Sequence, residues 1–266
     1  MFTRFPTVTP DDTLTRIRAL MRETGWRIVP VVSDANSLRL LGIIYRADLL
    51  VVSSTRSNAK ANNVMNPPKI TLRPQDEVLD ALDLMLRSDE WYSPVVSERE
   101  KISGVLGLEC VNCAVVASKS QILEKPVERY MSRDLIVVEP RDEVAKAWRL
   151  MREHRYSGLP VVKPNGEIVG VLTQYDLLRR GSARPVIESE SSPRRTLVGY
   201  YMSTPPVCVP RDSSMLEAAK LMCERDIGRV FVVDFNKKLI GVVDREDVAR
   251  CILEHFVSEH KGARSR

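Results

Sequence analysis

GVLTQYD, residues 170–176, is the stretch that decides the fold of this 266-residue chain. It ends the apolar run 168–172, which predicts a short buried strand. The residues that follow have the pattern of a helix start, with Thr173 as the N-cap. Backbone N–H groups are free at such a junction, and the helix dipole favours an anion there. Thr173 and Asp176 therefore predict either a capped helix alone, or a site where Asp176 binds a ribose diol and Thr173 meets a phosphate.

The pattern of this stretch occurs in four copies along the chain, and these copies define the domain organisation. A glycine opens each copy, 30 to 32 residues after a proline that stands two residues before an aspartate. A short β-rich run precedes each proline. A helical pattern and a second apolar run, such as LPVV at 159–162, lie between proline and glycine. The sequence predicts an α/β (α+β) fold of four β-α-β-β-α units, with bounds 1–56, 57–118, 119–182 and 195–258.

The first helix of each unit has a predicted start and a predicted buried face. The aspartate after the proline, at positions 12, 76, 142 and 212, is expected to be the N-cap. The polar stretch 181–196 is expected to be a linker between the third and fourth units. Apolar residues at helical spacing predict these core positions: Leu14, Ile17 and Met21; Val78, Ala81, Leu82 and Met85; Val144, Ala147, Trp148 and Met151; Met215, Ala219 and Met222.

Composition narrows the class of protein. Hydrophobic residues make up 44% of the chain and charged residues 28%, as is ordinary for a soluble protein with a real core. No apolar run reaches the roughly 18 residues of a membrane span, and we expect no signal peptide at residues 1–12. The net charge of +5 favours anionic ligands only weakly. Five cysteines, an odd number, predict a reducing, cytoplasmic setting without a disulfide framework.

Three features of the unit resemble the cystathionine-β-synthase (CBS) domain over nearly the whole chain. They are the P-x-D start, the h-P-V-V strand and the ending G-h-x-[ST]-x-x-D, which the third copy carries as PRD, LPVV and GVLTQYD. The resemblance implies that units pair into two Bateman modules, expected here as residues 1–118 and 119–266, each folding alone. It also implies allosteric clefts for AMP, ADP, ATP, S-adenosylmethionine or NAD. A chain of four units resembles the gamma subunit of AMP-activated protein kinase and stand-alone archaeal four-CBS proteins.

The two polar positions of the ending differ between the copies. The third copy has both. The first keeps Asp48 but has Tyr45 in place of the small hydroxyl residue. The second has Gly107 and Cys110, so its cleft is expected to be weak or empty.

The fourth copy keeps Asp247 but has Asp244 at the hydroxyl position, where a second carboxylate would repel a polyphosphate. Arg27 and Arg229 stand near the second strand, and the resemblance implies phosphate contacts around those positions. A solvated surface arginine is the alternative for each. The third copy has small residues there instead, and the adenine is expected in an apolar slot nearby. The remaining candidate site residues are therefore Gly158, Leu159, Ile136 and Val137.

Other motifs predict structure more than chemistry. Cys110 and Cys113 form a C-x-x-C in an apolar context with no second pair, so both are expected to be buried core cysteines. The three histidines lack the spacing of a metal site or a triad, and the phosphate-loop motifs are absent. The basic segments 192–195 and 261–266 are short and lack interleaved aromatics, which favours solvated chain over nucleic-acid binding.

We therefore expect a non-enzymatic, cytoplasmic adenine-nucleotide sensor without a required cofactor, metal or membrane. AMP, ADP or ATP would shift its conformation, and a protein partner or a second copy would read the shift. Two alternatives stay open. One is a module for S-adenosylmethionine or methylthioadenosine, which Asp244 and Tyr45 favour. The other is a nucleic-acid-binding regulator that uses the basic tail.

Overall fold

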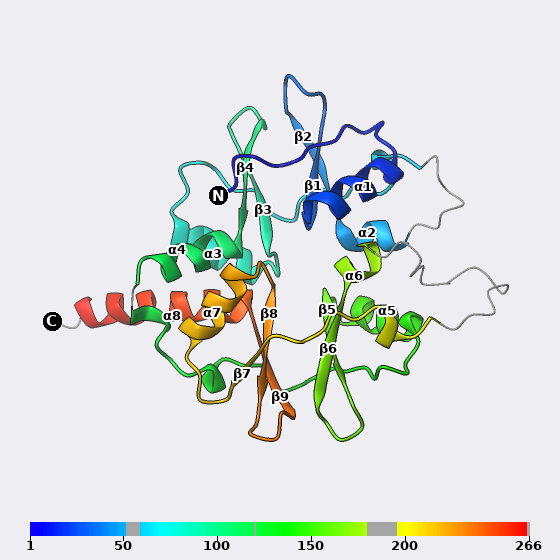
Figure 1. Ribbon diagram of the computed structural model, residues 1–266. Coiled ribbons are helices and arrows are strands. Elements are labelled where there is room, and N and C mark those ends of the chain that lie inside the picture. The colour runs from blue at the N-terminus through cyan, green and yellow to red at the C-terminus, as the bar shows by residue number, and fades with distance from the viewer. Residues whose placement is uncertain (52–58, 120, 180–195, 265–266) are drawn as a thin grey trace. The chain divides into compact units, whose positions relative to one another are not determined.

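The computed structural model describes residues 1–51, 59–119, 121–179 and 196–264, and these form four α+β repeats (Figure 1). The linker expected at 181–196 lies outside the described residues, apart from Thr196. The helices are α1 (Leu14–Thr24), α2 (Arg46–Val51), α3 (Val78–Arg87), α4 (Leu108–Ala117), α5 (Val144–Glu153), α6 (Gln174–Arg179), α7 (Met215–Glu224) and α8 (Arg245–Arg264). Short 3-10 turns are η2 (Ala61–Asn63), η3 (Gln121–Leu123), η4 (Val127–Arg129) and η5 (Val198–Tyr200).

An antiparallel hairpin forms the centre of each repeat, as predicted. The hairpins are β1 (Ile28–Val32) with β2 (Leu40–Tyr45), β3 (Tyr92–Val96) with β4 (Ile102–Gly107), β5 (Gly158–Val162) with β6 (Ile168–Thr173), and β8 (Arg229–Val233) with β9 (Leu239–Asp244). All four have the same register slip near the end of their first strand. The repeated sequence thus repeats in the backbone.

The proline of the hairpin decides how long the first strand of the repeat becomes. Pro160 in β5 has no backbone N–H, so it cannot donate to a neighbouring strand. In the third repeat the first strand is therefore reduced to a single parallel bridge between Val138 and Val161. The first two repeats have an equivalent single bridge. In the fourth repeat Phe231 takes the place of the proline, and its N–H donates to Val207 O over 3.0 Å. The first strand then grows into β7 (Cys208–Pro210), parallel to β8.

The first helix of each repeat buries its predicted apolar face, with one exception. Val78, the first residue of α3, is 54% exposed. In the other repeats a segment from elsewhere in the chain accepts a hydrogen bond from the first helical residue, as Thr196 O does from Val144 N over 2.8 Å. Among the described residues none covers Val78 in this way. The core residues confirmed are Leu14, Ile17, Met21, Ala81, Leu82, Met85, Val144, Ala147, Trp148, Met151, Met215, Ala219 and Met222.

The aspartates predicted as N-caps have a different role. Asp142 Oδ2 accepts a hydrogen bond from the backbone N–H of Glu139 over 2.8 Å, and Asp12 and Asp76 make the same contact in their repeats. The carboxylate therefore fixes the turn that leaves the first strand. In the fourth repeat the helix begins one residue later, and Asp212 makes no such bond within the part of the chain that the structure describes. The N-caps are instead Thr13, Glu77, Glu143 and Ser214.

Each hairpin is extended by a lead segment, the dipeptide that starts with methionine and precedes each repeat (1–2, 65–66, 131–132, 202–203). Val171 N donates to Ser203 O over 3.0 Å and Ser203 N to Val171 O over 2.8 Å. Gly170 permits this approach, because a Cβ there would lie 2.8 Å from Met202 Sδ and 2.9 Å from Ser203 O. The segments are exchanged, since 202–203 precedes the fourth repeat yet pairs with the third, and 131–132 pairs with the fourth. The first and second repeats exchange theirs likewise.

The compact units of the chain are not the predicted halves. Unit 1 comprises residues 1–4, 69–135 and 207–266, and unit 2 comprises residues 5–68 and 136–206. The second repeat thus joins the fourth, and the first joins the third. The prediction of separate bodies at 1–118 and 119–266 is wrong because helices of distant repeats pack together. In unit 1, α4 contacts α7 and α8, and α3 contacts α8; in unit 2, α6 contacts α1 and α2.

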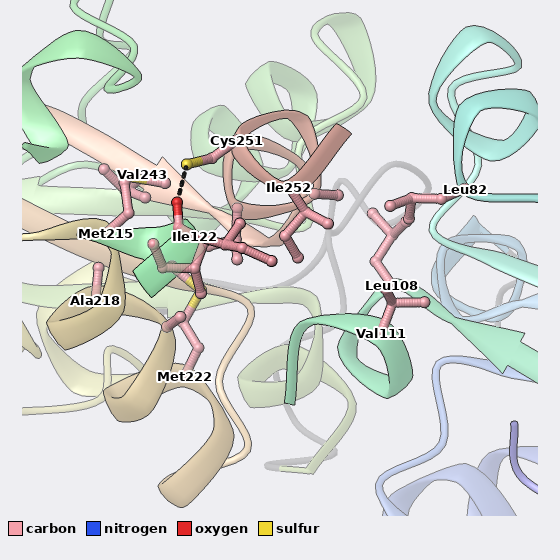
Figure 2. Close-up of a cluster of buried hydrophobic side chains, with 14 of the residues drawn as sticks. Leu82, Leu108, Val111, Ile122, Met215, Ala218, Met222, Val243, Cys251 and Ile252 are labelled. Atoms are coloured by element: carbon pink, nitrogen blue, oxygen red, sulfur yellow. Dashed lines mark hydrogen bonds between the residues drawn. The ribbon is translucent and has the colours of Figure 1, made fainter. Parts of the chain in front are cut away.

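The apolar cores follow this division. Unit 1 has one continuous core in which Leu82, Leu108 and Val111 of the second repeat share a cluster with residues of α7 and α8 (Figure 2). Unit 2 has two smaller cores, one in each repeat. They share leucines, since Leu178 of the third repeat is buried in the core of the first, and Leu50 of the first packs against the core of the third.

A disulfide joins two helices of unit 1, so the expectation of buried core cysteines without a disulfide is wrong. It links Cys113 in α4 to Cys223 in α7, 110 residues apart in the chain. Cys110 of the C-x-x-C is a free, half-buried thiol. In the chain-entropy treatment, closing a loop of this length restricts the unfolded chain enough to contribute about 5 kcal/mol. The prediction failed because a partner so distant in sequence leaves no local spacing signal.

Residues 119–266 expressed alone should melt well below the full chain, because α7 and α8 lose α3, α4 and the disulfide. Mixing with residues 1–118 should raise the melting temperature of the fragment again, which differential scanning calorimetry measures. A fragment that unfolds cooperatively at the temperature of the full chain, and does not respond to the other half, would contradict this division.

Candidate functional site

The candidate site of each repeat is its junction, the four residues where the last strand becomes the following helix. The junctions are 45–48, 107–110, 173–176 and 244–247. In the third, Thr173 Oγ1 accepts from the backbone N–H of Asp176 over 3.1 Å, which confirms Thr173 as the N-cap. Asp176 Oδ2 accepts in return from Thr173 N at 2.8 Å and from Thr173 Oγ1 at 2.5 Å. The two predicted residues are thus brought together, and they cap the helix reciprocally.

Ser203 is a junction residue that sequence reasoning missed. Its hydroxyl donates to Asp176 Oδ1 over 2.6 Å, and it belongs to the lead segment of the fourth repeat. Asp176 is only 7% exposed, so its buried charge is compensated by three donors from two parts of the chain. The repeated Met-x dipeptide before each unit was the signal that could have found Ser203.

The junctions of the first and fourth repeats keep one of these bonds. Asp48 Oδ2 accepts from Tyr45 N at 2.8 Å, and Asp247 Oδ2 accepts from Asp244 N at 2.9 Å. Burial raises the pKa of the Asp48 carboxyl. The junction of the second repeat has no carboxylate in the same place, because Cys110 replaces the aspartate. Three of the four repeats thus place a largely buried acid at the same point of the fold.

The neighbour across the hairpin differs at each junction. Gly158 pairs with Thr173, and a Cβ on Gly158 would lie 2.9 Å from Thr173 Cγ2, so the glycine permits this close pair. Arg229 pairs with Asp244. Arg27 corresponds to Gly228, the residue before Arg229. The carbonyl of Arg27 accepts a hydrogen bond from the first residue of α2, as the carbonyl of Gly228 does from the first residue of α8. The two predicted arginines are therefore not equivalent.

The residues expected to line an adenine slot differ in how deeply they are buried. Leu159 is fully buried in the core of the third repeat, so only its backbone can face a ligand. Ile136 is half-buried against the same core, and Val137 is 36% exposed. Of these three residues, Val137 alone presents a substantial apolar surface to solvent.

The fourth junction holds two interacting carboxyls. Burial raises the pKa of Asp244, and the positive charge of Arg229 opposes that rise. Burial also raises the pKa of Asp247, and the charge of Asp244 adds to the effect, bringing it to about 8. Asp244 Oδ1 accepts from the N–H of Glu246 over 2.9 Å, which helps to hold its charge. The pair therefore favours sharing a proton near neutral pH.

The second junction is occupied by side chains of its own unit. Arg245, 2% exposed, donates to Tyr92 Oη over 2.8 Å and forms ion pairs with Glu109 at 3.1 Å and Asp226 at 2.9 Å. Tyr92 Oη in turn donates to Glu109 Oε1 over 2.8 Å. Gly107 leaves room for the tyrosine ring, since a Cβ there would lie 2.9 Å from Tyr92 Cε1.

Unit 2 has a similar arginine. Arg46 occupies the place of Arg245 in its own repeat, donates to the carbonyls of Gly25 at 2.6 Å and Trp26 at 3.0 Å, and lies 4.9 Å from the ring centre of Tyr175. In each unit an arginine of one junction thus contacts a residue of the other junction. Among the described residues no cluster of three or more histidine, cysteine or acidic side chains could hold a metal, and no described helix is long and apolar enough to cross a membrane.

The acid pair of the fourth junction predicts a pH dependence. Asp247 has a pKa of about 8 in the folded protein and an ordinary value of 3.8. The folded state therefore holds an extra proton between these values, and the free energy of unfolding falls as the pH rises through that range. We expect the melting temperature to fall by several degrees between about pH 5.5 and about pH 8.5.

Asp244→Asn should lessen this dependence, because it removes the charge that adds to the effect of burial on the pKa of Asp247. Asp212→Asn, an exposed acid of the same repeat, is the matched control and should keep the slope of the unaltered protein. Thermal melts across the pH range measure all three, and equal slopes would contradict the coupling.

Proteins similar to the whole chain are known from an archaeon. MJ1404 of Methanocaldococcus jannaschii is 30% identical over 256 residues, 93% of this chain, and the match spans 59% of MJ1404. MJ1225 of the same organism is 23% identical over 92% of this chain and 94% of its own length. The crystal structure of MJ1225, described as a candidate archaeal homologue of g-AMPK, has a TM-score of 0.80 at 21% identity over 93% of this chain and 95% of that chain. This likeness shows the fold.

A plant protein resembles part of the chain. CBSX2, a chloroplastic CBS domain-containing protein of Arabidopsis thaliana, is 35% identical over 144 residues, 46% of this chain and 60% of CBSX2. A crystal structure of CBSX2 in complex with AMP has a TM-score of 0.43 at 34% identity, over 49% of this chain and 97% of that chain.

The family profile of the CBS domain matches four stretches of the chain, residues 1–54, 61–111, 127–183 and 198–254. Each stretch contains one hairpin and one junction. Together they cover well over half of the sequence, so this chain belongs to the CBS-domain family and carries four copies of its domain.

Proposed function

We propose that this protein is a non-enzymatic regulator that binds adenosine-containing ligands, AMP, ADP or ATP, at its junctions and changes conformation on binding. The observation that carries the proposal is the junction of the third repeat. An ionised carboxylate offers about four acceptor positions, and Asp176 uses three of them on Thr173 and Ser203. The carboxylate is thus held in place with capacity left for a ribose hydroxyl.

The proposed contacts of the ligand follow from this arrangement. The ribose diol donates to Asp176, and Gly158 lets the ligand approach the backbone beside it. Thr173 already donates to Asp176 and accepts from its N–H, so a phosphate at Thr173 would compete with helix capping. We therefore assign most of the binding free energy at this junction to the ribose and the adenine. CBSX2, which is 35% identical over 46% of this chain, has been crystallised in complex with AMP, and this supports a nucleotide as the first choice.

Ser203 offers a way to transmit binding. The remaining acceptor position of Asp176 takes one ribose hydroxyl, so the second hydroxyl of the diol competes with that of Ser203, whose backbone is bonded to β6 through Val171. Ligand binding then favours a conformation in which the lead segment of the fourth repeat has moved, and a partner reads the change in population.

The repeats are proposed to differ in ligand binding. The second junction takes no nucleotide, because it lacks the carboxylate and because Tyr92 and Arg245 occupy the space. The fourth junction favours S-adenosylmethionine or methylthioadenosine as the second candidate ligands. There Asp244 lies across the hairpin from Arg229, the cation that a phosphate would need, and would compete with a phosphate for its charge. Calorimetric competition between AMP, ATP and S-adenosylmethionine, after mass spectrometry of any co-purifying ligand, separates the two candidates.

Asp176→Ala should weaken AMP binding by on the order of tenfold to a few hundredfold, since charge-assisted hydrogen bonds contribute about 1.5–3 kcal/mol. Asp176→Asn keeps the shape and part of the acceptor capacity, so it should cost less. Both variants should also melt lower, because three internal hydrogen bonds depend on this side chain. Isothermal titration calorimetry well below the melting temperature measures the affinity.

Asp142→Ala is the matched control, because that carboxylate also fixes a turn of the third repeat but lies away from the junction. It should lower the melting temperature and leave the AMP affinity unchanged. Equal affinities in Asp176→Ala and Asp142→Ala would reject the ribose role and leave helix capping as the only function of Asp176.

A further inference from the structure

The cysteines of this chain are confined to one of its two units. All five, at positions 110, 113, 208, 223 and 251, belong to unit 1, and unit 2 contains none. Cys113 and Cys223 are joined by the disulfide, and Cys110, Cys208 and Cys251 are thiols outside it. The positions that correspond to Cys113 in the other repeats hold Val51, Arg179 and Arg250. The disulfide is therefore a feature of this unit and not of the repeated fold.

We propose that Cys113–Cys223 is a redox site, which dithiol reductants open and disulfide oxidants close, and that its state sets how firmly the second and fourth repeats are held together. The bond crosses from α4 of the second repeat to α7 of the fourth. Both cysteines are half-buried, and neither belongs to the fully buried core of the unit. When this bond opens, the second and fourth repeats stay together, because they share one apolar core.

The redox site adjoins the buried arginine of the same unit. Asn112, the residue before Cys113, is 3% exposed, and its Nδ2 donates to the backbone oxygen of Arg245 over 2.9 Å. The guanidinium of Arg245 contacts Tyr92 and Glu109 at the second junction. The disulfide thus fixes the helix that carries the hydrogen bond to the fourth junction. Opening it releases α4 from α7 at one point and weakens the hold on Arg245.

The chemistry is a thiol–disulfide exchange that balances with a dithiol as the co-reactant. A thiolate of the dithiol attacks one sulfur, the Cys113–Cys223 bond breaks, and a mixed disulfide forms. The second thiol of the reductant then displaces the protein sulfur. The protein gains two electrons and two protons as two thiols, and the reductant leaves as a cyclic disulfide. Oxidation by a disulfide such as oxidised glutathione reverses the process.

Counting thiols and measuring thermal melts on the full chain tests the proposal. After treatment with oxidised glutathione and denaturation, the protein should show three reactive thiols, and after dithiothreitol it should show five. Reduction should lower the melting temperature of unit 1 by on the order of 10 °C. Hydrogen exchange should rise at the start of α8, while residues 136–179 of unit 2, which have no cysteine, should stay unchanged.

Two variants separate the site from general thiol effects. Cys113→Ser should melt like the reduced protein and lose its response to dithiothreitol, whereas Cys110→Ser, one turn away on the same helix, should respond like the unaltered chain. Five thiols after oxidation would overturn the disulfide. If three thiols are found but reduction changes neither the melting temperature nor hydrogen exchange, the proposed effect of the disulfide on unit 1 would be overturned. Neither result depends on a nucleotide, so each can be told apart from a failure of the proposed ligand site.

Discussion

A hydrogen bond from a backbone N–H to a carboxylate three residues later is the interaction on which the rest of the structure depends. It closes the junction at Asp48, Asp176 and Asp247, where a strand must turn at once into a helix. Each such helix then packs against the other repeat of its unit. The bond therefore fixes both the local turn and the direction in which the packing helix leaves it. The second junction lacks the acid, and there Tyr92 and Arg245 provide the polar contacts instead.

Helix capping and the proposed binding of a ribose are not exclusive roles for the same carboxylate. A capping acid is held in one rotamer by donors from its own backbone, so its remaining acceptor capacity is preorganised. At Asp176 the third donor is Ser203, which arrives from the next repeat. A ligand that uses this acid thus acts on a hydrogen bond between segments distant in sequence, which local capping by itself would not provide.

The two units solve the same packing problem in different ways. Unit 1 has one continuous core, a buried arginine with ion pairs, and a disulfide. Unit 2 has two cores that share leucines, and its buried arginine contacts two carbonyls and a tyrosine ring. Because a buried guanidinium must be compensated, each unit keeps its repeats in a defined relation. Only unit 1 adds a covalent bond, which makes that relation responsive to thiols.

The sequence by itself determined the repeat, the hairpins, the buried helix faces and the capping role of Thr173, because each depends on residues within a few positions of one another. It predicted the aspartates of the P-x-D motif as N-caps, but the true N-caps lie one or two residues later. The reason is that a carboxylate that fixes a turn and an N-cap share the same local sequence pattern. Only the tertiary structure decided that the second repeat joins the fourth, that Ser203 bonds to Asp176, and that Cys113 finds Cys223. The last two of these contacts join residues that are 27 and 110 positions apart in the chain. At such separations no periodicity in the sequence indicates which surfaces pack together.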